Sequence, residues 1–180
     1  MCNDLGGESM RNRVLYFDVS SLLLSVPYRE HSPNVQQTFD CISQFSPEFF
    51  DNISLDKEAI ELLTEFSQKA DVLLYPIQKR FNRAFLIEQG FDESVLAPDA
   101  PYTVRYGDAN EINHKISHAH AIDADWFFVS GGYDKAYIEP QFPERFIDAG
   151  TKGVSPDLIQ NLMDKFDVSE KRDLKVSTST

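Results

Sequence analysis

The stretch RVLYFDV at residues 13–19 decides the fold of this chain. Its apolar residues run without alternation from Val14 to Phe17, which is typical of a strand buried on both faces, as parallel strands covered by helices are. Asp18 closes the run. Because α/β proteins bind ligands beyond the carboxyl ends of their strands, we predict that the first strand delivers Asp18 to the ligand-binding edge of a parallel sheet.

Further apolar runs of this kind occupy residues 72–75, 102–104 and 126–129, and residues 145–148 are predicted to be a short fifth strand. Between and after them, helical patterns cover residues 54–70, 79–89 and 108–121 and a segment that starts at Ser155-Pro156. Strands that alternate with helices indicate right-handed crossovers. The sequence therefore predicts an α/β fold, with a three-layer, doubly wound, Rossmann-like and mainly parallel sheet of about five strands.

The domain organisation follows from length and from the one long interruption. A chain of 180 residues fits one domain of ordinary size, which we place at residues 11–168. Residues 24–53 contain three prolines and are predicted to be an irregular insert after strand one, since loops this long cover a site or move. The polar ends, residues 1–10 and 169–180, are predicted to be flexible tails, and Met10 is an alternative natural start.

Composition excludes several classes of function. The net charge is −12, from 29 acidic and 17 basic residues, so the average field repels nucleic-acid backbones and no nucleic-acid partner is expected. No apolar run approaches the roughly 18 residues of a membrane span, so no membrane association is expected. Two cysteines and the absence of a secretory signal pattern predict a cytoplasmic, acidic protein.

Asp18 itself has two interpretations that the sequence leaves equal. A carboxylate at the end of a buried strand must be solvated, hydrogen-bonded or bound to a cation. In one interpretation, Asp18 is a functional group that contacts a ligand. The other is an Asx-turn, in which the side chain accepts a backbone N–H of Ser20 or Ser21.

Two segments around the predicted site carry a resemblance. The stretches VLYFDVSSL at 14–22 and FVSGGYD at 128–134, followed by RFID at 145–148 and GVSP at 153–156, resemble the haloacid dehalogenase (HAD) superfamily of hydrolases, and in particular its small members with minimal caps. The resemblance implies a HAD-like fold, with residues 24–53 as the minimal cap. It also implies that Asp18 is a nucleophile that forms a covalent intermediate, which water then cleaves.

The same resemblance implies roles for other residues. Lys115 matches the basic residue that holds the nucleophile and the phosphoryl group together, and Asp134 matches an acidic residue near a metal, with Asp18 as the other possible ligand and Mg²⁺ as a possible cofactor. Each has a simpler interpretation from the residues alone. Lys115 could be a solvated lysine on a helix, and Asp134 could be a turn residue beside Gly131-Gly132.

The catalytic motifs are degenerate at two positions. Phosphatase members place an aspartate as general acid where this chain has Ser20, and a serine hydroxyl does not titrate near neutral pH. The family presents serine or threonine at the end of strand two, where this chain has Tyr75, Pro76 and Ile77. Proline lacks even a backbone N–H.

A separate metal site is less favoured. His114 and His118 lie four residues apart, as a metal pair on one helical face would, but the residues between them provide no glutamate in the arrangement of a zinc hydrolase. A lysine between the two ligands would also raise the electrostatic cost of binding a cation.

Two functions remain open. The first is a binding or regulatory protein that keeps the hydrolase fold, is impaired in phosphatase chemistry and binds a protein partner through the 24–53 insert. The alternative is an active HAD-type hydrolase, phosphatase or dehalogenase-like, that uses Asp18 on a small phosphorylated or halogenated substrate. The insert is rich in aromatic residues, which either serve a partner or pack on their own domain: Tyr28, Phe39, Phe45, Phe49 and Phe50.

Overall fold

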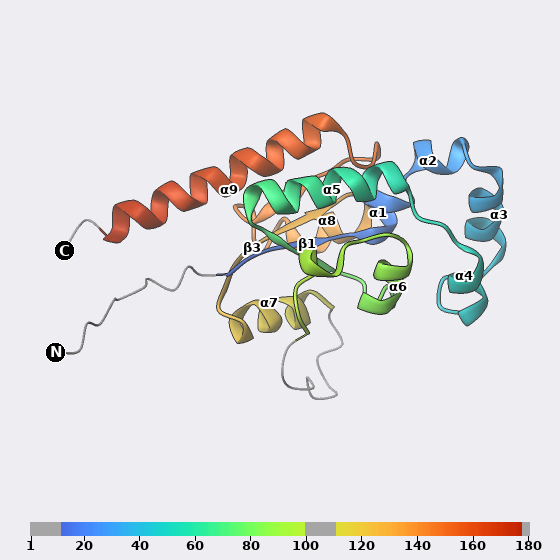
Figure 1. Cartoon of the computed structure of the whole chain (residues 1–180), viewed down its shortest axis with the longest axis horizontal. Helices are drawn as coiled ribbons and strands as arrows, with labels where there is room; N and C mark the ends of the chain where they lie inside the picture. The colour runs from blue at the N-terminus through green and yellow to red at the C-terminus, as the bar shows by residue number, and fades with distance from the viewer. Residues whose placement is uncertain (1–11, 100–110, 178–180) are drawn as a thin grey trace.

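The sheet lies at the centre of the chain (Figure 1). The computed structural model describes residues 12–99 and 111–177, apart from the side chains of residues 133, 134 and 168–177. Within these residues the sheet has four parallel strands, in the order β2-β1-β3-β4. They are β1 (Asn12–Phe17), β2 (Leu73–Pro76), β3 (Ala124–Ser130) and β4 (Phe146–Asp148).

The predicted α/β class and parallel sheet are therefore confirmed, but the count of five strands is wrong for the described residues. The predicted strand at 102–104 lies outside them. Among the described residues, the sheet continues beyond β2 only as an isolated parallel bridge between Leu74 and Leu96, next to which Ala97 N–H donates to Leu74 O at 2.8 Å.

Helices fill the connections between the strands. After β1 come α1 (Val19–Leu23), α2 (Val26–Glu30), α3 (Pro33–Cys41), α4 (Pro47–Asn52) and α5 (Lys57–Ala70). After β2 come α6 (Arg83–Glu88), the 3₁₀ turn η1 (Glu93–Val95) and α7 (Glu111–Ala121). The remaining helices are α8 (Tyr133–Ile138) and α9 (Pro156–Ser177).

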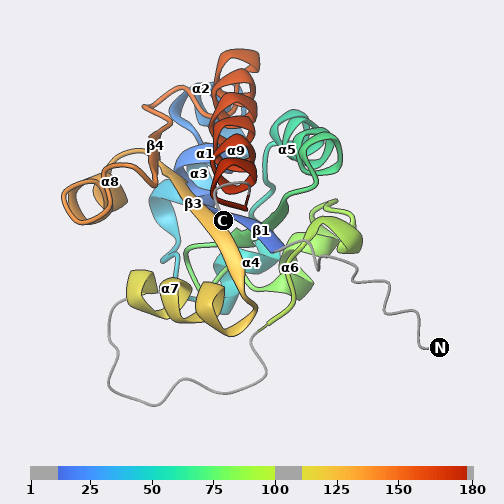
Figure 2. The ribbon, with the colours of Figure 1, turned by 90° about the vertical axis from the view of Figure 1, so that its left-hand side faces the viewer.

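Alternate residues of the strands feed two separate cores. Leu15 and Phe17 of β1 point to one face, where they join buried side chains of α5 and α9 such as Leu63 and Leu162. Val14 and Tyr16 point to the other face and pack with Ile112 of α7, among others. Figures 1 and 2 show α5 and α9 on one side of the sheet and α7 on the opposite side. The fold thus has three layers.

The insert after strand one is not irregular, which corrects our prediction. Residues 24–53 contain three short helices, and each begins with a serine N-cap followed by a proline in the first turn. The side chains of Ser25 and Ser46 accept N–H groups of Tyr28 and Phe49. Proline fits the first helical turn because its missing N–H has no partner there anyway. The prolines that suggested a loop therefore start helices.

Helix boundaries differ from the predicted ones for similar local reasons. Asp56, rather than Ser54, caps α5 by accepting the N–H groups of Glu58 and Ala59. Asn82 caps α6, which therefore begins at Arg83 rather than at residue 79. The C-terminal helix α9 continues to Ser177, beyond residue 168 at which we placed the end of the domain.

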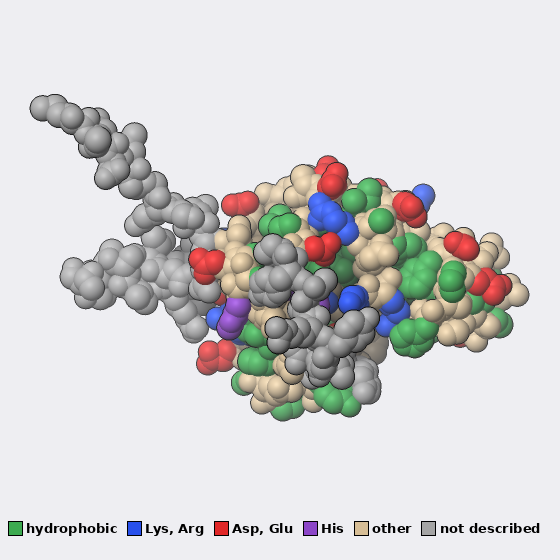
Figure 3. Space-filling model, turned by 90° about the horizontal axis from the view of Figure 1, so that it is seen from below, with side chains coloured by type: hydrophobic (Ala, Val, Ile, Leu, Met, Phe, Trp, Pro, Cys, Tyr) green, Lys and Arg blue, Asp and Glu red, His purple; other side chains and the backbone are tan. Residues whose placement is uncertain are grey.

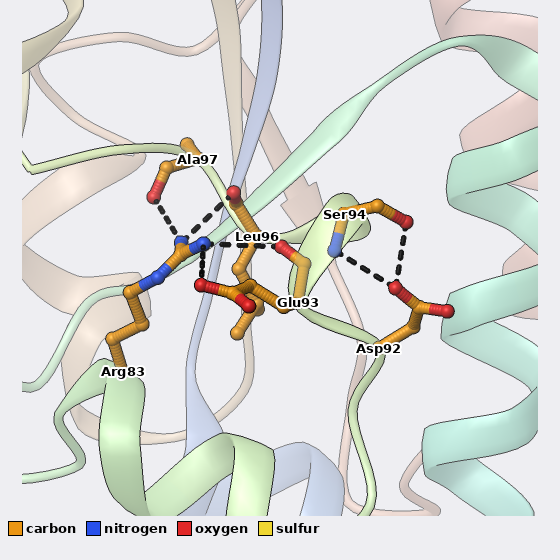
Figure 4. A network of polar contacts seen from close by, with 6 residues as sticks. All are labelled: Arg83, Asp92, Glu93, Ser94, Leu96 and Ala97. Carbon is orange, nitrogen blue, oxygen red and sulfur yellow. Dashed lines mark hydrogen bonds and ion pairs between the residues drawn. The ribbon is translucent and has the colours of Figure 1, made fainter.

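Arg83 fixes the edge of the sheet beyond β2 (Figure 4). Its guanidinium donates to the carbonyls of Leu96 and Ala97, each at 3.0 Å, and to the carbonyl of Glu93 at 3.1 Å. One side chain therefore binds three backbone carbonyls, one in η1 and two in the segment that follows it. This holds the segment after η1 in position to pair with Leu74.

No helix among the described residues is both long and apolar enough to cross a membrane.

Candidate functional site

Asp18 lies at the point where the direction of the chain across the sheet reverses. The chain passes from β1 to β2 on one side and returns to β3 on the other, so β1 and β3 are neighbours whose connections lead away in opposite directions. Ligands of open α/β sheets bind at such a switch point. Asp18 follows β1, and its N–H donates to Val129 O of β3 at 3.0 Å. The predicted position of Asp18 is therefore confirmed.

The Asp18 side chain is 5% exposed and both of its carboxylate oxygens accept hydrogen bonds. Oδ1 accepts the N–H of Ser21 at 3.2 Å, and Oδ2 accepts the hydroxyl of Ser130, the last residue of β3, at 2.9 Å. The bond to Ser21 is the Asx-type cap that the sequence predicted as one alternative, and here it begins α1. The bond to Ser130 joins the ends of two strands.

Gln78 provides the third hydrogen bond, from its Nε2 to Asp18 Oδ1. The orientation of this amide is fixed because its Oε1 accepts the N–H of Val19 at 3.0 Å, and a backbone N–H can only donate. Nε2 therefore faces the carboxylate. Gln78 is 7% exposed and follows β2 by two residues, so it occupies the space next to Asp18 that the sequence assigned to Tyr75, Pro76 and Ile77.

Tyr75 itself lies away from Asp18, on the other face of the sheet. Its hydroxyl donates to Asp99 Oδ1 at 2.6 Å, and its ring stacks on the imidazole of His118 with centroids 4.2 Å apart. Pro76 pairs with Phe17 in the parallel ladder of β1 and β2 and is buried. No hydrogen bond described for Tyr75 or Pro76 involves the Asp18 carboxylate.

A cavity of about 520 Å³ opens beside Asp18 and extends under the insert. This volume is within the roughly 300–1,000 Å³ of small-molecule sites. Ser20 lies in its wall, and the Ser20 hydroxyl accepts a hydrogen bond from Arg80 at 3.3 Å. The Arg80 guanidinium also donates to Gln44 Oε1 at 3.0 Å, which ties the cavity wall to the insert. The cavity is therefore shared between the sheet edge and the insert.

The glycines after β3 are needed for the close packing of this wall. The N–H of Gly131 donates to Ser21 Oγ at 3.2 Å. A Cβ atom at position 131 would collide with the carbonyl of Gly150, in the turn after β4. Gly131 is thus required for the turns after β3 and β4 to meet beside Asp18.

Lys115 is buried on the opposite face of the sheet, and no described contact joins it to Asp18. It is 2% exposed, and its Nζ lies 5.4 Å from the centroid of the Tyr75 ring. Burial lowers the pKa of Lys115 to about 8, partly offset by the nearby Glu111 carboxylate. The interpretation of Lys115 as a solvated surface lysine is therefore wrong, while its catalytic role stays a prediction.

The predicted magnesium ligands are only partly described, because the side chain of Asp134 lies outside the described residues. Within the described part of the chain, no group of three or more His, Cys, Asp or Glu side chains could hold a metal ion. Asp18 offers a carboxylate whose two oxygens already accept from Gln78, Ser130 and Ser21. The magnesium site at Asp18 and Asp134 therefore stays a prediction.

His118 has a structural role rather than a role as a metal ligand. The Pro98 carbonyl can only accept, so His118 Nε2 carries the proton that it donates there at 2.7 Å. Nδ1 then accepts the Tyr16 hydroxyl at 2.8 Å. Burial lowers the pKa of His118 and raises that of Tyr16. This bond fastens α7 and the 98–99 segment to β1.

The aromatic residues of the insert mostly pack on their own domain. Phe49 is fully buried, and Tyr28, Phe39 and Phe50 are partly buried against the same core. Phe45 differs because it is 81% exposed, at the rim of the cavity. The case for a protein partner on the insert is thereby reduced to Phe45.

Three residues of this site, Gln78, Arg80 and Ser130, were not predicted. For Ser130 the signal was available, since it ends a buried parallel strand in the same way as Asp18. Gln78 and Arg80 follow the end of β2 by two and four residues, at the same sheet edge. Comparison of the chain with protein-family models, curated proteins and solved structures finds no match.

Proposed function

We propose that this protein has a HAD-like fold, is impaired in hydrolysis, and uses the cavity beside Asp18 to bind a ligand, as a binding or regulatory protein. The parallel sheet, the aspartate at the end of β1 and its place at the switch point support the HAD-like assignment. The observation that carries the loss of hydrolysis is that both carboxylate oxygens of Asp18 accept hydrogen bonds from the protein itself.

A nucleophilic carboxylate needs an oxygen directed at the electrophile. In this protein three donors hold the Asp18 oxygens, and two of them, Gln78 and Ser130, are themselves buried. Freeing Oδ1 would leave the buried Gln78 amide without its acceptor, which costs about 1–3 kcal/mol. The hydrogen bonds therefore stabilise Asp18 as a structural acceptor.

The residue in the general-acid position gives a second, independent argument. Ser20 accepts a hydrogen bond from the permanently charged Arg80. A hydroxyl in that environment has no proton that it can transfer at neutral pH. Departure of a leaving group would have to proceed without protein acid catalysis.

The alternative function, an active hydrolase, is favoured by one observation, namely that the cavity reaches Asp18. Turnover separates the two functions. Wild-type protein and Asp18→Asn are incubated with p-nitrophenyl phosphate and with a 2-haloacid, with and without Mg²⁺. We expect no release of product that depends on Asp18. Product release by the wild type that Asp18→Asn abolishes would establish the hydrolase instead.

The Asp18→Asn variant suits this test because the site can accommodate an amide. The asparagine Oδ1 can accept from Gln78, and its Nδ2 can donate to Ser130 Oγ. The Ser130 hydroxyl can then donate to the carbonyl of Gly131, which lies 3.1 Å away. The variant is expected to fold, which circular dichroism can check.

A further inference from the structure

Two arginine–phenylalanine stacks line the cavity. The Arg29 guanidinium lies 3.9 Å from the Phe39 ring centroid, and that of Arg80 lies 5.1 Å from the Phe45 centroid. All four residues line the cavity. Figure 3 shows Lys and Arg atoms beside hydrophobic atoms on the side of the molecule where α2–α4 lie.

Arg29 brings a positive charge that no carboxylate of the described residues neutralises by an ion pair. Its Nε donates to the carbonyl of Leu24 at 3.0 Å, and its Nη1 lies 3.5 Å from Gln36 Oε1. Both acceptors are neutral. A guanidinium with five donors therefore retains donors for a further acceptor. An oxyanion is the acceptor that matches its planar fork.

Phe45 supplies an apolar surface that the protein leaves in water. Its ring is 81% exposed, although four other aromatic residues of the insert pack on the core. One face is near the Arg80 guanidinium. Aromatic rings attract other rings by edge or offset stacking, in addition to the burial of their surface. An exposed ring at the rim of a cavity is therefore suited to stack on a planar ligand.

We infer that the cavity binds an aromatic oxyanion, that is, a planar ring bearing a phosphate or carboxylate group, with the ring on Phe45 and the oxyanion on Arg29. This inference rests on the proposed binding function and names the ligand class of that site. Recognition is assigned to the insert, and Asp18 makes no contact with the oxyanion. A ligand of this kind would bind although the average field of an acidic protein repels anions.

Binding is measured by isothermal titration calorimetry on the full chain carrying Asp18→Asn, so that turnover cannot consume the probe. Phenyl phosphate and benzoate are the two arms that distinguish phosphate from carboxylate. Inorganic phosphate and phenol each present one half of the ligand. We expect phenyl phosphate or benzoate to bind at least roughly tenfold more tightly than either half, as burial of a phenyl ring and a charged hydrogen bond predict.

Variants assign the two halves of the ligand to residues. Arg29→Gln is expected to weaken the preferred probe by about tenfold, and Arg29→Lys by less, because lysine keeps the charge but not the planar fork. Phe45→Leu keeps an apolar side chain and removes the ring. It is expected to weaken the aromatic probes by a few fold and to leave inorganic phosphate unchanged. Lys69→Gln, on the exposed face of α5, is the charge control and should bind as the parent does.

Three results would overturn the inference. The first is equal affinity for phenyl phosphate, benzoate and inorganic phosphate. The second is affinity for an aromatic probe that neither Arg29→Gln nor Phe45→Leu changes. The third is no measurable binding of any probe. Failure of the proposed function has a different readout, which is release of phenol from phenyl phosphate by the wild-type protein and not by Asp18→Asn.

Discussion

Gln78 donates its side-chain amide to the carboxylate of Asp18 while its carbonyl oxygen accepts the N–H of Val19. One residue after β2 thus satisfies the last residue before α1 and the first residue within it. The arrangement fixes the direction in which the chain leaves β1.

Removing the Gln78 amide should destabilise the protein. In Gln78→Leu the N–H of Val19 and Oδ1 of Asp18 lose a partner while the volume is nearly kept. We expect the free energy of unfolding to fall by about 2 kcal/mol. This is the lower limit of the cost of two unsatisfied buried groups, because water from the cavity can reach them. Urea denaturation measures this. Gln68→Leu, on the exposed surface of α5, is the control, and an equal loss in both variants would contradict the role of Gln78.

The Tyr16–His118 bond predicts a loss of stability in mild acid. The unfolded chain protonates its histidines near pH 6.5, whereas burial lowers the pKa of His118 in the fold. The unfolded state then binds more protons, so the free energy of unfolding falls as the pH drops below about 6.5. The charged groups around this imidazole, Lys115 and Asp99, act on its pKa in opposite directions.

Urea denaturation at pH 7.5 and 5.5 tests the acid dependence. His118→Gln cannot gain the proton, so it should lose less stability between the two pH values than the wild type does. His120→Gln changes an exposed histidine of the same helix and should keep the wild-type dependence. The same slope in all three proteins would show that His118 is not the source.

Replacing Lys115 should stabilise the protein, whereas replacing Gln78 should destabilise it. The Lys115 pKa of about 8 lies below the unfolded value of about 10.5, so at neutral pH the charge is held at a cost of up to roughly 3 kcal/mol. Lys115→Met should raise the free energy of unfolding at pH 7.5. In the wild type that free energy should rise between pH 7.5 and 9.5, and in the variant this rise should be absent. Destabilisation of Lys115→Met would contradict this account, because the Tyr75 ring and the Glu111 carboxylate would then stabilise the ammonium by more than its burial costs.

The sequence was sufficient for the central layer of the fold. Continuous apolar runs, which are typical of strands buried on both faces, predicted β1, β2 and β3. The short strand predicted at residues 145–148 is β4. The end of the first run then predicted Asp18 at the edge of the sheet. The insert was not predictable by the same rule. Proline is common both in the first turn of helices and in loops. The pairs Ser32-Pro33 and Ser46-Pro47 are therefore compatible with either structure, and the packing of the insert on the core decides between them.

The candidate site was predictable only in part, because the residues that donate to Asp18 come from distant segments of the chain. Asp18 follows β1 and Ser20 lies in α1, and both were found from one continuous motif. Gln78 reaches Asp18 across 60 positions and Ser130 across 112. Such contacts depend on strand order and on where each loop turns, and neither is encoded in local spacing. Lys115 shows the same limit, because helical periodicity alone did not reveal its burial.

The Arg83 network predicts a local loss at the sheet edge. Arg83→Lys keeps the charge but cannot reach the carbonyls of Glu93, Leu96 and Ala97 together. We expect the free energy of unfolding to fall by about 1–2 kcal/mol. Glu93→Gln removes only the ion pair with a carboxylate that is 73% exposed, and such pairs contribute little. If both substitutions had the same effect, the ion pair rather than the carbonyl contacts would hold this edge.

Gly131 predicts a loss of stability that can be localised. In Gly131→Ala the new methyl group collides with the carbonyl of Gly150, and neither backbone can retreat easily, because the N–H of Ala149 donates to Ser130 O at 3.0 Å. We expect a loss of about 2 kcal/mol or more and faster hydrogen exchange at the Ala149 amide. Gly90→Ala is the matched control, since position 90 has a φ of 116° but no atom within 4 Å of the added methyl. It should lose stability through backbone strain, while exchange at Ala149 changes no more than the global loss requires. Faster exchange at Ala149 in both variants, in proportion to their stability, would mean that the turns after β3 and β4 do not depend on Gly131.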